Sequence, residues 1–192
     1  MSDSLTTGNE VTNVAAGKPK VGGAIFAAPT TAVLPEDAVS ELGSDYKCLG
    51  YISEDGLTNT SERDTTTIKA WGGDVVLVVD NGINDSFKFK LIESLNEEVL
   101  KFVYGTDNVT GTLSEGIKIA VKSVPEQIEK VLVVEMVLRG ALKRIVVPRA
   151  VITGVDEIVY RDNDSIGYNT TIAALADNTG NSHYEYIQAV NS

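Results

Sequence analysis

The stretch YISEDGLTNTSE, residues 51–62, has the residue types and spacing of an EF-hand calcium-binding loop. Its sixth residue is Gly56 and its twelfth is Glu62, as such a loop requires. Oxygen-bearing side chains stand at the third, fifth and ninth positions: Ser53, Asp55 and Asn59. The first position is Tyr51, however, where an EF-hand carries an aspartate, and the sequence on both sides has the pattern of strands rather than helices. We therefore interpret residues 54–67 as a polar connection between two strands, with cation binding in another geometry as an alternative.

Nucleophilic or metal chemistry would depend on His183 and Cys48, the only histidine and the only cysteine. One of each is too few for the usual zinc sites, and no G-x-S-x-G motif or phosphate-binding glycine pattern occurs. We interpret His183 as an ordinary surface histidine and Cys48 as a buried structural thiol. Pairs of carboxylates are frequent because the chain has 27 acidic residues, so they do not indicate acid–base catalysis. We expect a protein that is not an enzyme and has no cofactor and no metal.

The charge balance disfavours nucleic-acid and membrane binding by the chain as a whole. Its 192 residues include 16 basic and 27 acidic side chains, which gives a formal net charge of -11. One basic stretch, RGALKRIVVPR, contains no acid and carries Arg139, Lys143, Arg144 and Arg149. We interpret it as a charged solvent or interface face on a pair of strands, with local nucleic-acid contact as an alternative. The N-terminus has no signal peptide and no apolar run is long enough to span a membrane, so we expect synthesis in a cytoplasm.

Hydrophobic patterning predicts many strands. Residues 1–19 are polar and aperiodic, which predicts a flexible N-terminal arm, and residues 20–192 are expected to form a single β domain. Strand-like segments occupy 21–29, 47–53, 65–71, 74–80, 86–94, 116–122, 127–140, 141–154, 156–162, 165–176 and 182–189. The pair Gly72–Gly73 between two of them predicts a tight hairpin turn, because primed turns need positive φ.

One α-helix is predicted after the strand at 86–94. Ser94 and Glu97 have the spacing of a capping box, and Gly105 stands where a C-terminal cap belongs. Between them runs an apolar stripe of Leu95, Val99, Phe102 and Val103. The fold class that follows is mainly β: an antiparallel β-sandwich or barrel with one flanking α-helix.

Several predicted strands are apolar on both faces. The runs VVLVV (75–79) and VLVV (131–134) do not alternate, and the sequence from 131 to 152 is nearly continuous strand with only Gly140 to turn it. A sheet that must be buried on both faces in a chain of this size indicates that neighbouring subunits cover it. The sequence therefore favours assembly.

The amino-acid sequences of several segments resemble those of a known protein family. They are KVGGAIFAAP, LGYISEDGLT, IKAWGGDVV, FKFKLIESLNEEVLKFVYGTDNVTG, ALKRIVVPRAVIT, IGYNTTIAAL and HYEYI. Together, from Lys20 to Ile187, they resemble the major tail proteins of long-tailed bacteriophages, which form the tail tube. The resemblance is compatible with a phage virion, a prophage remnant or a tail-derived bacteriocin.

The resemblance implies the phage tail-tube fold, six subunits in a ring, and rings that stack into a tube through which genomic DNA is ejected into the host. Each subunit would contribute four strands to a continuous inner β-barrel. Expected partners are further copies of the chain, tail terminator and tail-tip proteins at the tube ends, the tape measure protein and transient, non-specific DNA in the lumen, with no membrane insertion. The expected location is the virion tail, after synthesis in the host bacterial cytoplasm.

Within this interpretation, residues 54–67 are predicted to be a stacking loop against the next ring, and the N-terminal arm to reach a neighbouring subunit. The candidate inter-ring contact residues are Glu54, Asp55, Glu62, Arg63 and Asp64. The alternative function is a soluble β-sandwich binding module or virion decoration module, with or without dependence on calcium.

Overall fold

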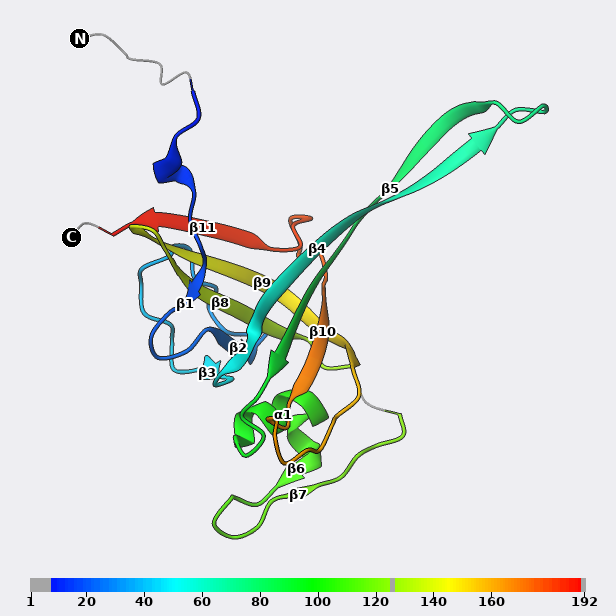
Figure 1. Ribbon diagram of the computed structural model, residues 1–192. Helices are drawn as coiled ribbons and strands as arrows, with labels where there is room; N and C mark the ends of the chain where they lie inside the picture. Colours follow the sequence, from blue (N-terminus) through cyan, green and yellow to red (C-terminus); the bar gives the residue numbers. More distant parts are fainter. Residues whose placement is uncertain (1–7, 125–126, 191–192) are drawn as a thin grey trace, which may run out of the picture.

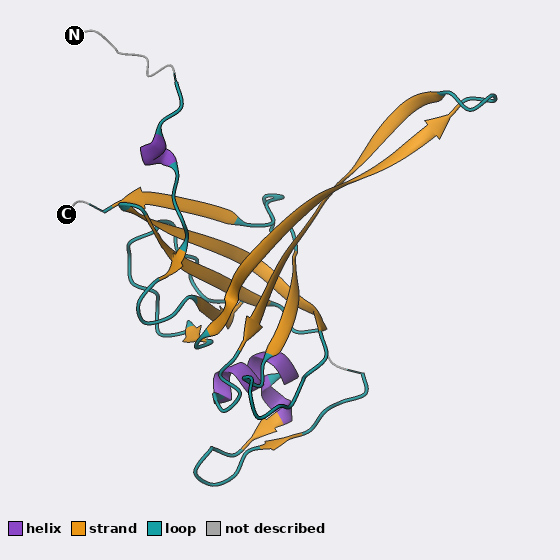
Figure 2. Cartoon of the chain, viewed as in Figure 1, coloured by secondary structure: helices purple, strands orange, loops and turns teal. Residues whose placement is uncertain are grey.

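The computed structural model describes residues 8–124 and 127–190, and its centre is one large antiparallel sheet (Figures 1 and 2). Its strands are β1 (Lys18–Pro19), β2 (Ile25–Pro29), β3 (Lys47–Cys48), β4 (Ile52–Lys69), β5 (Val75–Leu91), β8 (Lys130–Leu138), β9 (Ala141–Val155), β10 (Tyr168–Ala174) and β11 (Tyr184–Ala189). The main order is β3-β2-β8-β9-β10-β5-β4, while β1 pairs with β8 and β11 with β9. A separate two-stranded sheet joins β6 (Val109–Thr110) to β7 (Lys118–Ile119).

The mainly β class with one α-helix is confirmed, and within the single chain the large sheet is open rather than closed into a barrel. One predicted strand is absent, and another is shorter than predicted. Residues 156–162 form no strand, because β10 already occupies the place beside β9 in the ladder. The segment at 116–122 contains only the two-residue β7. Two short 3-10 helices, η1 (Val11–Asn13) and η2 (Thr106–Asn108), complete the elements.

The central ladder of β8 and β9 is covered on both faces by the chain itself. Leu132 and Val134 belong to the main hydrophobic core, whereas Val131 and Val133 face a second cluster that includes Ala32, Tyr46 and partly buried leucines. The alternation follows from the two-residue period of a strand. The segment between β2 and β3 supplies the cover of the second face. The expectation that neighbouring subunits must cover this ladder is therefore wrong.

The basic stretch is not a solvent face throughout, because Arg144 is fully buried. It stands directly opposite Glu135 in the β8–β9 ladder and forms an ion pair with it. Its guanidinium also donates to the backbone carbonyl oxygens of Asp37 and Ser40, at 2.8 and 2.7 Å. A buried charge is tolerated only when it is paired and hydrogen-bonded, and here Arg144 fastens the covering segment to the sheet. Lys20 contacts the other oxygen of Glu135 at 3.0 Å.

Helix α1 (Glu97–Tyr104) follows β5 and packs its apolar side on the main core. The predicted C-terminal cap is confirmed, because Gly105 has a φ of 93° and its N–H bonds to the Lys101 carbonyl. The predicted start is wrong: the N-cap is Asn96, whose side chain accepts a hydrogen bond from the Glu98 N–H. Leu95 consequently lies before the helix and is exposed, because the capping geometry moves the first turn two residues along the chain.

Strands β4 and β5 form one long hairpin that projects from the body of the molecule (Figure 1). The predicted position of the turn is confirmed, since Gly72 and Gly73 both have positive φ. The predicted primed turn with two residues is wrong, because the Ala70 N–H bonds to the Asp74 carbonyl and the loop therefore has three residues, 71–73. The predicted polar connection at 54–67 is wrong, because these residues are part of β4 and pair with β5. Sequence alone underestimates this strand, since a polar segment gains a strand conformation from a partner far along the chain. The EF-hand interpretation fails with it, because extended residues point alternately to opposite faces.

The N-terminal segment joins the sheet near its end, where Lys18 and Pro19 pair with Val137 and Met136 of β8. Residues 1–7 lie outside the described residues, and the flexibility of the arm stays a prediction. In the part of the chain that the structure describes, no helix is long and apolar enough to cross a membrane.

Candidate assembly surface

The distal part of the β4–β5 hairpin, residues 62–83, is an exposed apolar arm. All of its residues are exposed to solvent. Its large hydrophobic side chains are Ile68, Trp71, Val75, Val76, Leu77, Val78, Val79 and Ile83. Trp71, at the turn, has a relative exposure of 106%. We call residues 62–83 the hairpin arm. An apolar extension of this kind marks a binding surface, because isolated surface hydrophobic residues are common but contiguous exposed ones are not.

Both faces and both edges of the hairpin arm are uncovered. Ile68 pairs with Leu77 on one face, and Thr67 pairs with Val78 on the other. The neighbouring strand β10 pairs with β5 only from Asp85 to Leu91. Beyond that point, β5 has a second edge with no strand beside it in the described chain, and β4 likewise has a free outer edge. Open edges offer unpaired N–H and C=O groups and are templates for pairing with another chain.

The root of the arm is held by a buried aspartate, Asp85, whose exposed fraction is 4%. One carboxylate oxygen accepts hydrogen bonds from the Asn59 and Ser61 side chains of β4, both at 2.8 Å. The other accepts a 2.8 Å hydrogen bond from the Ser182 hydroxyl and lies 2.5 Å from Nδ1 of His183. These contacts connect β4, β5 and the segment before β11, so they fix the direction in which the arm leaves the body.

His183 is therefore not the surface histidine that the sequence predicted. Its ring packs edge-on against Phe87, with centroids 5.4 Å apart, and its side chain is largely buried. The group of Ser182, His183 and Asp85 does not have the arrangement of a catalytic triad. The serine hydroxyl donates to the aspartate directly, and the histidine uses Nδ1 toward the same carboxylate oxygen.

The electrostatics of the root favour an ionised carboxylate. Burial by itself would raise the pKa of Asp85, but hydrogen bonds from Ser182, Asn59 and Ser61, together with the nearby His183, hold that pKa below its usual value. A carboxylate with several donors is stabilised in its charged form, and the root is consequently a structural anchor at neutral pH.

Cys48 is the other residue whose predicted environment is partly wrong. The thiol is half-buried rather than fully buried, and it accepts a hydrogen bond from the Gly50 N–H at 3.3 Å. Within the residues that the structure describes, no group of three or more histidine, cysteine, aspartate or glutamate side chains is arranged to hold a metal ion.

Comparison with known proteins places the chain in a family. The family model described as "Phage tail tube protein" matches residues 9–191, nearly the entire chain. The chain belongs to the phage tail tube protein family. A tail tube protein is a structural component of a virion tail, and the resemblance found in the sequence is confirmed.

Two solved structures align along most of this tail tube protein with low similarity. The cap that terminates the tube of the anti-feeding prophage is 9% identical, covers 97% of this chain and 99% of its own, and gives a TM-score of 0.37. The sheath–tube complex of an extracellular contractile injection system, PVC in its extended state, is 10% identical, covers 90% and 93%, and gives 0.34. A search of curated proteins found no significant match.

The predicted contact residues of this tail tube protein are not gathered in one place. Glu62, Arg63 and Asp64 belong to the hairpin arm, and Arg63 contacts Asp80 at 3.4 Å on its surface. As successive strand residues, Glu62 and Asp64 share one face and Arg63 has the other. Glu54 and Asp55 lie on the body side of the root, in the irregular stretch between Ile52 and Leu57 where the register between β4 and β5 shifts. Seven residues of strand separate Asp55 from Glu62, which is roughly 23 Å.

The most prominent residues of the arm were not among the predicted contacts. Trp71 and the run Val75–Val79 are exposed, and the sequence showed the run only as a strand with two apolar faces. The lack of alternation between apolar and polar residues in this run was the sequence signal that could have identified the exposed surface. The run Val75–Val79 pairs with residues 66–69 of β4, nearer the tip of the arm than the polar residues with ligand-like spacing.

Proposed function

We propose that this tail tube protein assembles into six-membered rings, that the rings stack into a hollow tube, and that the tube conducts genomic DNA during ejection. The observation that carries the proposal is the hairpin arm, an extended two-stranded ribbon that is apolar and uncovered in the single chain. Family membership supports a role in the tail tube. Ring number, stacking and DNA passage are the steps that the proposal adds.

Ring closure would remove the hazard that the open strand edges create. A two-stranded ribbon is at most marginally stable alone in water, and exposed apolar edges lead to uncontrolled aggregation. In a head-to-tail ring, every free edge of one subunit meets an edge of the next, and closure leaves none unpaired. Four strands from each of six subunits would give a barrel roughly 48 Å across between backbones, for strands ~4.8 Å apart and tilted ~40°. Duplex DNA fits within such a barrel after side chains are subtracted.

The net charge is compatible with passage of DNA. At -11 for each chain, six copies carry a formal charge of 6 × -11 = -66. A lumen of that sign would repel the phosphate backbone, and DNA would slide without being retained. The remaining partners in this proposal are terminator and tail-tip proteins at the tube ends and the tape measure protein in the lumen before ejection.

In this proposal the acidic residues of β4 contact the adjoining ring. Glu54, Asp55, Glu62 and Asp64 are exposed and project from a strand that is free along its outer edge. Because they belong to a strand rather than a loop, the contact would be made by the side of the hairpin and not by a flexible connection.

Electron microscopy of the purified protein tests the proposal, because hollow tubes of uniform diameter with sixfold end views are expected. The double variant Asp55→Lys/Glu62→Lys should stay folded by circular dichroism and form few or no tubes. The matched control is Asp107→Lys/Glu115→Lys, which makes the same charge change on exposed residues outside the hairpin and should assemble normally. Persistent monomers of the unmodified protein would overturn the tube and favour a soluble binding module. Normal tubes from the first double variant would overturn the assigned contact alone.

A further inference from the structure

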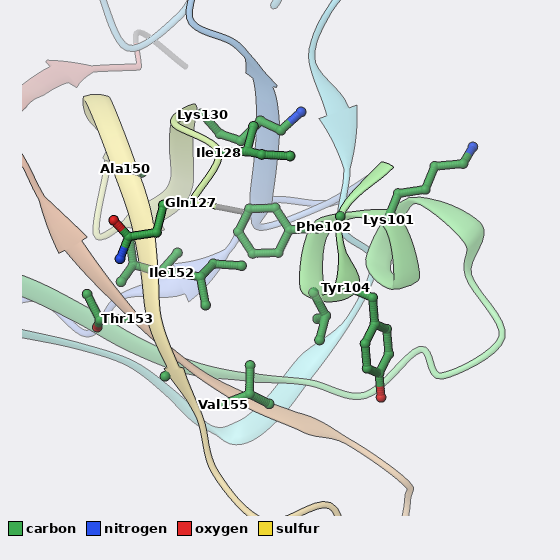
Figure 3. A pocket seen from close by; sticks show the side chains of 14 residues that line it. Lys101, Phe102, Tyr104, Gln127, Ile128, Lys130, Ala150, Ile152, Thr153 and Val155 are labelled. Atoms are coloured by element: carbon green, nitrogen blue, oxygen red, sulfur yellow. The ribbon is translucent and has the colours of Figure 1, made fainter. Parts of the chain in front are cut away.

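A pocket of about 500 Å³ lies between helix α1 and the C-terminal half of β9 (Figure 3). Its floor is apolar, and Phe102 from the helix and Ile152 from the strand point toward one another across it. Two lysines, Lys101 and Lys130, line the same pocket and extend their amino groups outward. Clefts of roughly 300–1,000 Å³ with apolar walls and a few polar groups are the usual size and chemistry of a binding pocket. We call this the helix pocket.

The tip of the hairpin arm, at the opposite end of the molecule, presents one exposed side chain, Trp71, which we call the knob. Trp71 is the only tryptophan and has a relative exposure of 106%, so it contacts almost nothing in its own chain. The turn that presents it is well defined: the Ala70 N–H bonds to the Asp74 carbonyl at 2.8 Å, and the Gly73 N–H bonds to the Ala70 carbonyl at 3.0 Å. A rigid turn lowers the entropy cost of inserting a side chain into a partner. Tryptophan is enriched among the residues that dominate protein interfaces.

The charges of the two ends are complementary. The hairpin arm contains four acidic side chains, Glu62, Asp64, Asp74 and Asp80, and two basic ones, Arg63 and Lys69. Its net charge is therefore 2 - 4 = -2. At the helix pocket, Lys101 is paired with Glu98 at 3.0 Å, whereas Lys130 makes no ion pair within the described residues. Asp74, three residues after the tryptophan, is exposed on the same turn.

The two sites lie at opposite ends of the molecule. The tip of the hairpin and helix α1 are far apart in Figure 1, so an arm cannot reach the helix pocket of its own chain. A contact between two different surfaces of identical chains is heterologous, and heterologous contacts build rings or open stacks. Knob and pocket at opposite ends therefore have the geometry of a repeating contact.

We propose that Trp71 of one subunit inserts into the helix pocket of a second copy of this chain, with Asp74 against Lys130. This inference rests on the proposed tube, because it names the partner of the arm and the surface that receives it. The occupant is a second copy because the tryptophan and the pocket exist on every subunit, the pocket floor is apolar, and the charges beside the two are opposite.

Variants of the knob and the pocket provide the first test. Trp71→Ala should raise the critical concentration for tube formation ~10-fold or more, as expected for loss of a central aromatic contact, with the thermal unfolding of the monomer unchanged. Gly154→Leu should also raise the critical concentration for tube formation, because it places a larger side chain at the helix pocket. Gly154 lines the helix pocket, an added Cβ there meets no atom within 4 Å, and its φ is not positive, so the backbone accepts a side chain at this position. The matched control Gly154→Ala should retain nearly normal assembly.

An intermolecular disulfide provides the second test. In a Cys48→Ser background, Trp71→Cys and Ile152→Cys should oxidise into covalent ladders within tubes, because the side chain of Ile152 points into the helix pocket. The pair Trp71→Cys and Val33→Cys, with the second cysteine on an exposed loop, should not. Tubes that form normally with Trp71→Ala and show no ladder would overturn this docking and leave the tube intact. Failure of the unmodified protein to form tubes would instead overturn the proposed function, and this inference with it.

Discussion

Two segments with the same apolar character have opposite environments in this tail tube protein. The run VLVV at 131–134 is completely enclosed, with exposures from 0 to 2%, whereas the run VVLVV at 75–79 is exposed by 38 to 62%. The first is central in a sheet whose two faces are covered by separate hydrophobic clusters. The second is part of a ribbon that has left the body beyond Asp85. Two apolar runs of similar composition therefore have different roles: one contributes to folding of the monomer, and the other is available for association.

The largest difference is expected when one charge is placed in each run. Val133→Asp would bury an unpaired carboxylate and should destabilise the monomer by about 3–5 kcal/mol. Val78→Asp should leave the free energy of unfolding within ~0.5 kcal/mol, because the side chain is exposed, but should prevent tube formation. Urea denaturation and electron microscopy measure the two effects. Equal destabilisation by both variants would contradict the division into body and arm.

A second contrast compares a buried ion pair with an exposed one. Arg144→Leu should destabilise the monomer by about 3 kcal/mol, because it removes the buried one of the two basic partners of Glu135 and leaves only Lys20. Arg63→Ala removes the exposed contact to Asp80 and should cost less than ~1 kcal/mol. Thermal unfolding of the two single variants measures the difference. The double variant Arg144→Leu/Glu135→Leu should recover part of the lost stability, and no recovery would show that the carbonyl contacts of Arg144 dominate.

The root between the two regions should show a dependence on pH. Asp85→Asn is expected to cost about 1–2 kcal/mol at pH 7, because its neutral amide loses charge-assisted hydrogen bonds. The pKa of Asp85 is lowered in the folded state, so its contribution is present above the ordinary aspartate pKa of ~3.9 and disappears as pH falls through the lower folded value. The stability difference between the variant and the unmodified protein should therefore shrink below about pH 4. A constant difference from pH 7 to pH 3 would contradict this linkage.

The smallest effect is expected from matched glycines in two turns. Gly140 joins β8 to β9 with a φ of 70°, Gly73 is at the tip of the arm with a φ of 104°, and an added Cβ meets no atom within 4 Å at either. Gly140→Ala should lower global stability by ~1 kcal/mol. Gly73→Ala should leave global stability nearly unchanged. It should speed amide hydrogen exchange only at the tip, because the arm can unfold locally while the core stays folded. Hydrogen exchange with mass spectrometry distinguishes local from global loss.

Features that depend on neighbouring residues could be predicted from the sequence. The position of the hairpin turn at Gly72–Gly73 and the C-terminal cap at Gly105 are confirmed, because each needs a positive φ at a fixed position, although the loop has three residues rather than two. Most strands were also predicted, since an apolar run bounded by turn residues is a local signal. The start of α1 was misplaced by competition between two adjacent caps, of which Asn96 forms the hydrogen bond.

Features that depend on distant residues could not be predicted. Residues 54–67 form a strand because β5 lies beside them, and their ligand-like spacing is incidental to that pairing. His183 is enclosed because Asp85 and Phe87, about a hundred residues earlier, are brought to it. The contact role of the five acidic and basic residues of β4 stays a prediction.

The mainly β class, the single helix, the position of the hairpin turn and membership of a tail tube family follow from the amino-acid sequence, because periodicity, turn chemistry and segment similarity are properties of the chain alone. Which apolar strands are enclosed and which are left open follows from the tertiary structure. A strand has two faces whatever its sequence, and whether each is covered depends on segments brought together by folding. For 131–134 the chain supplies that cover itself, and for 75–79 it does not.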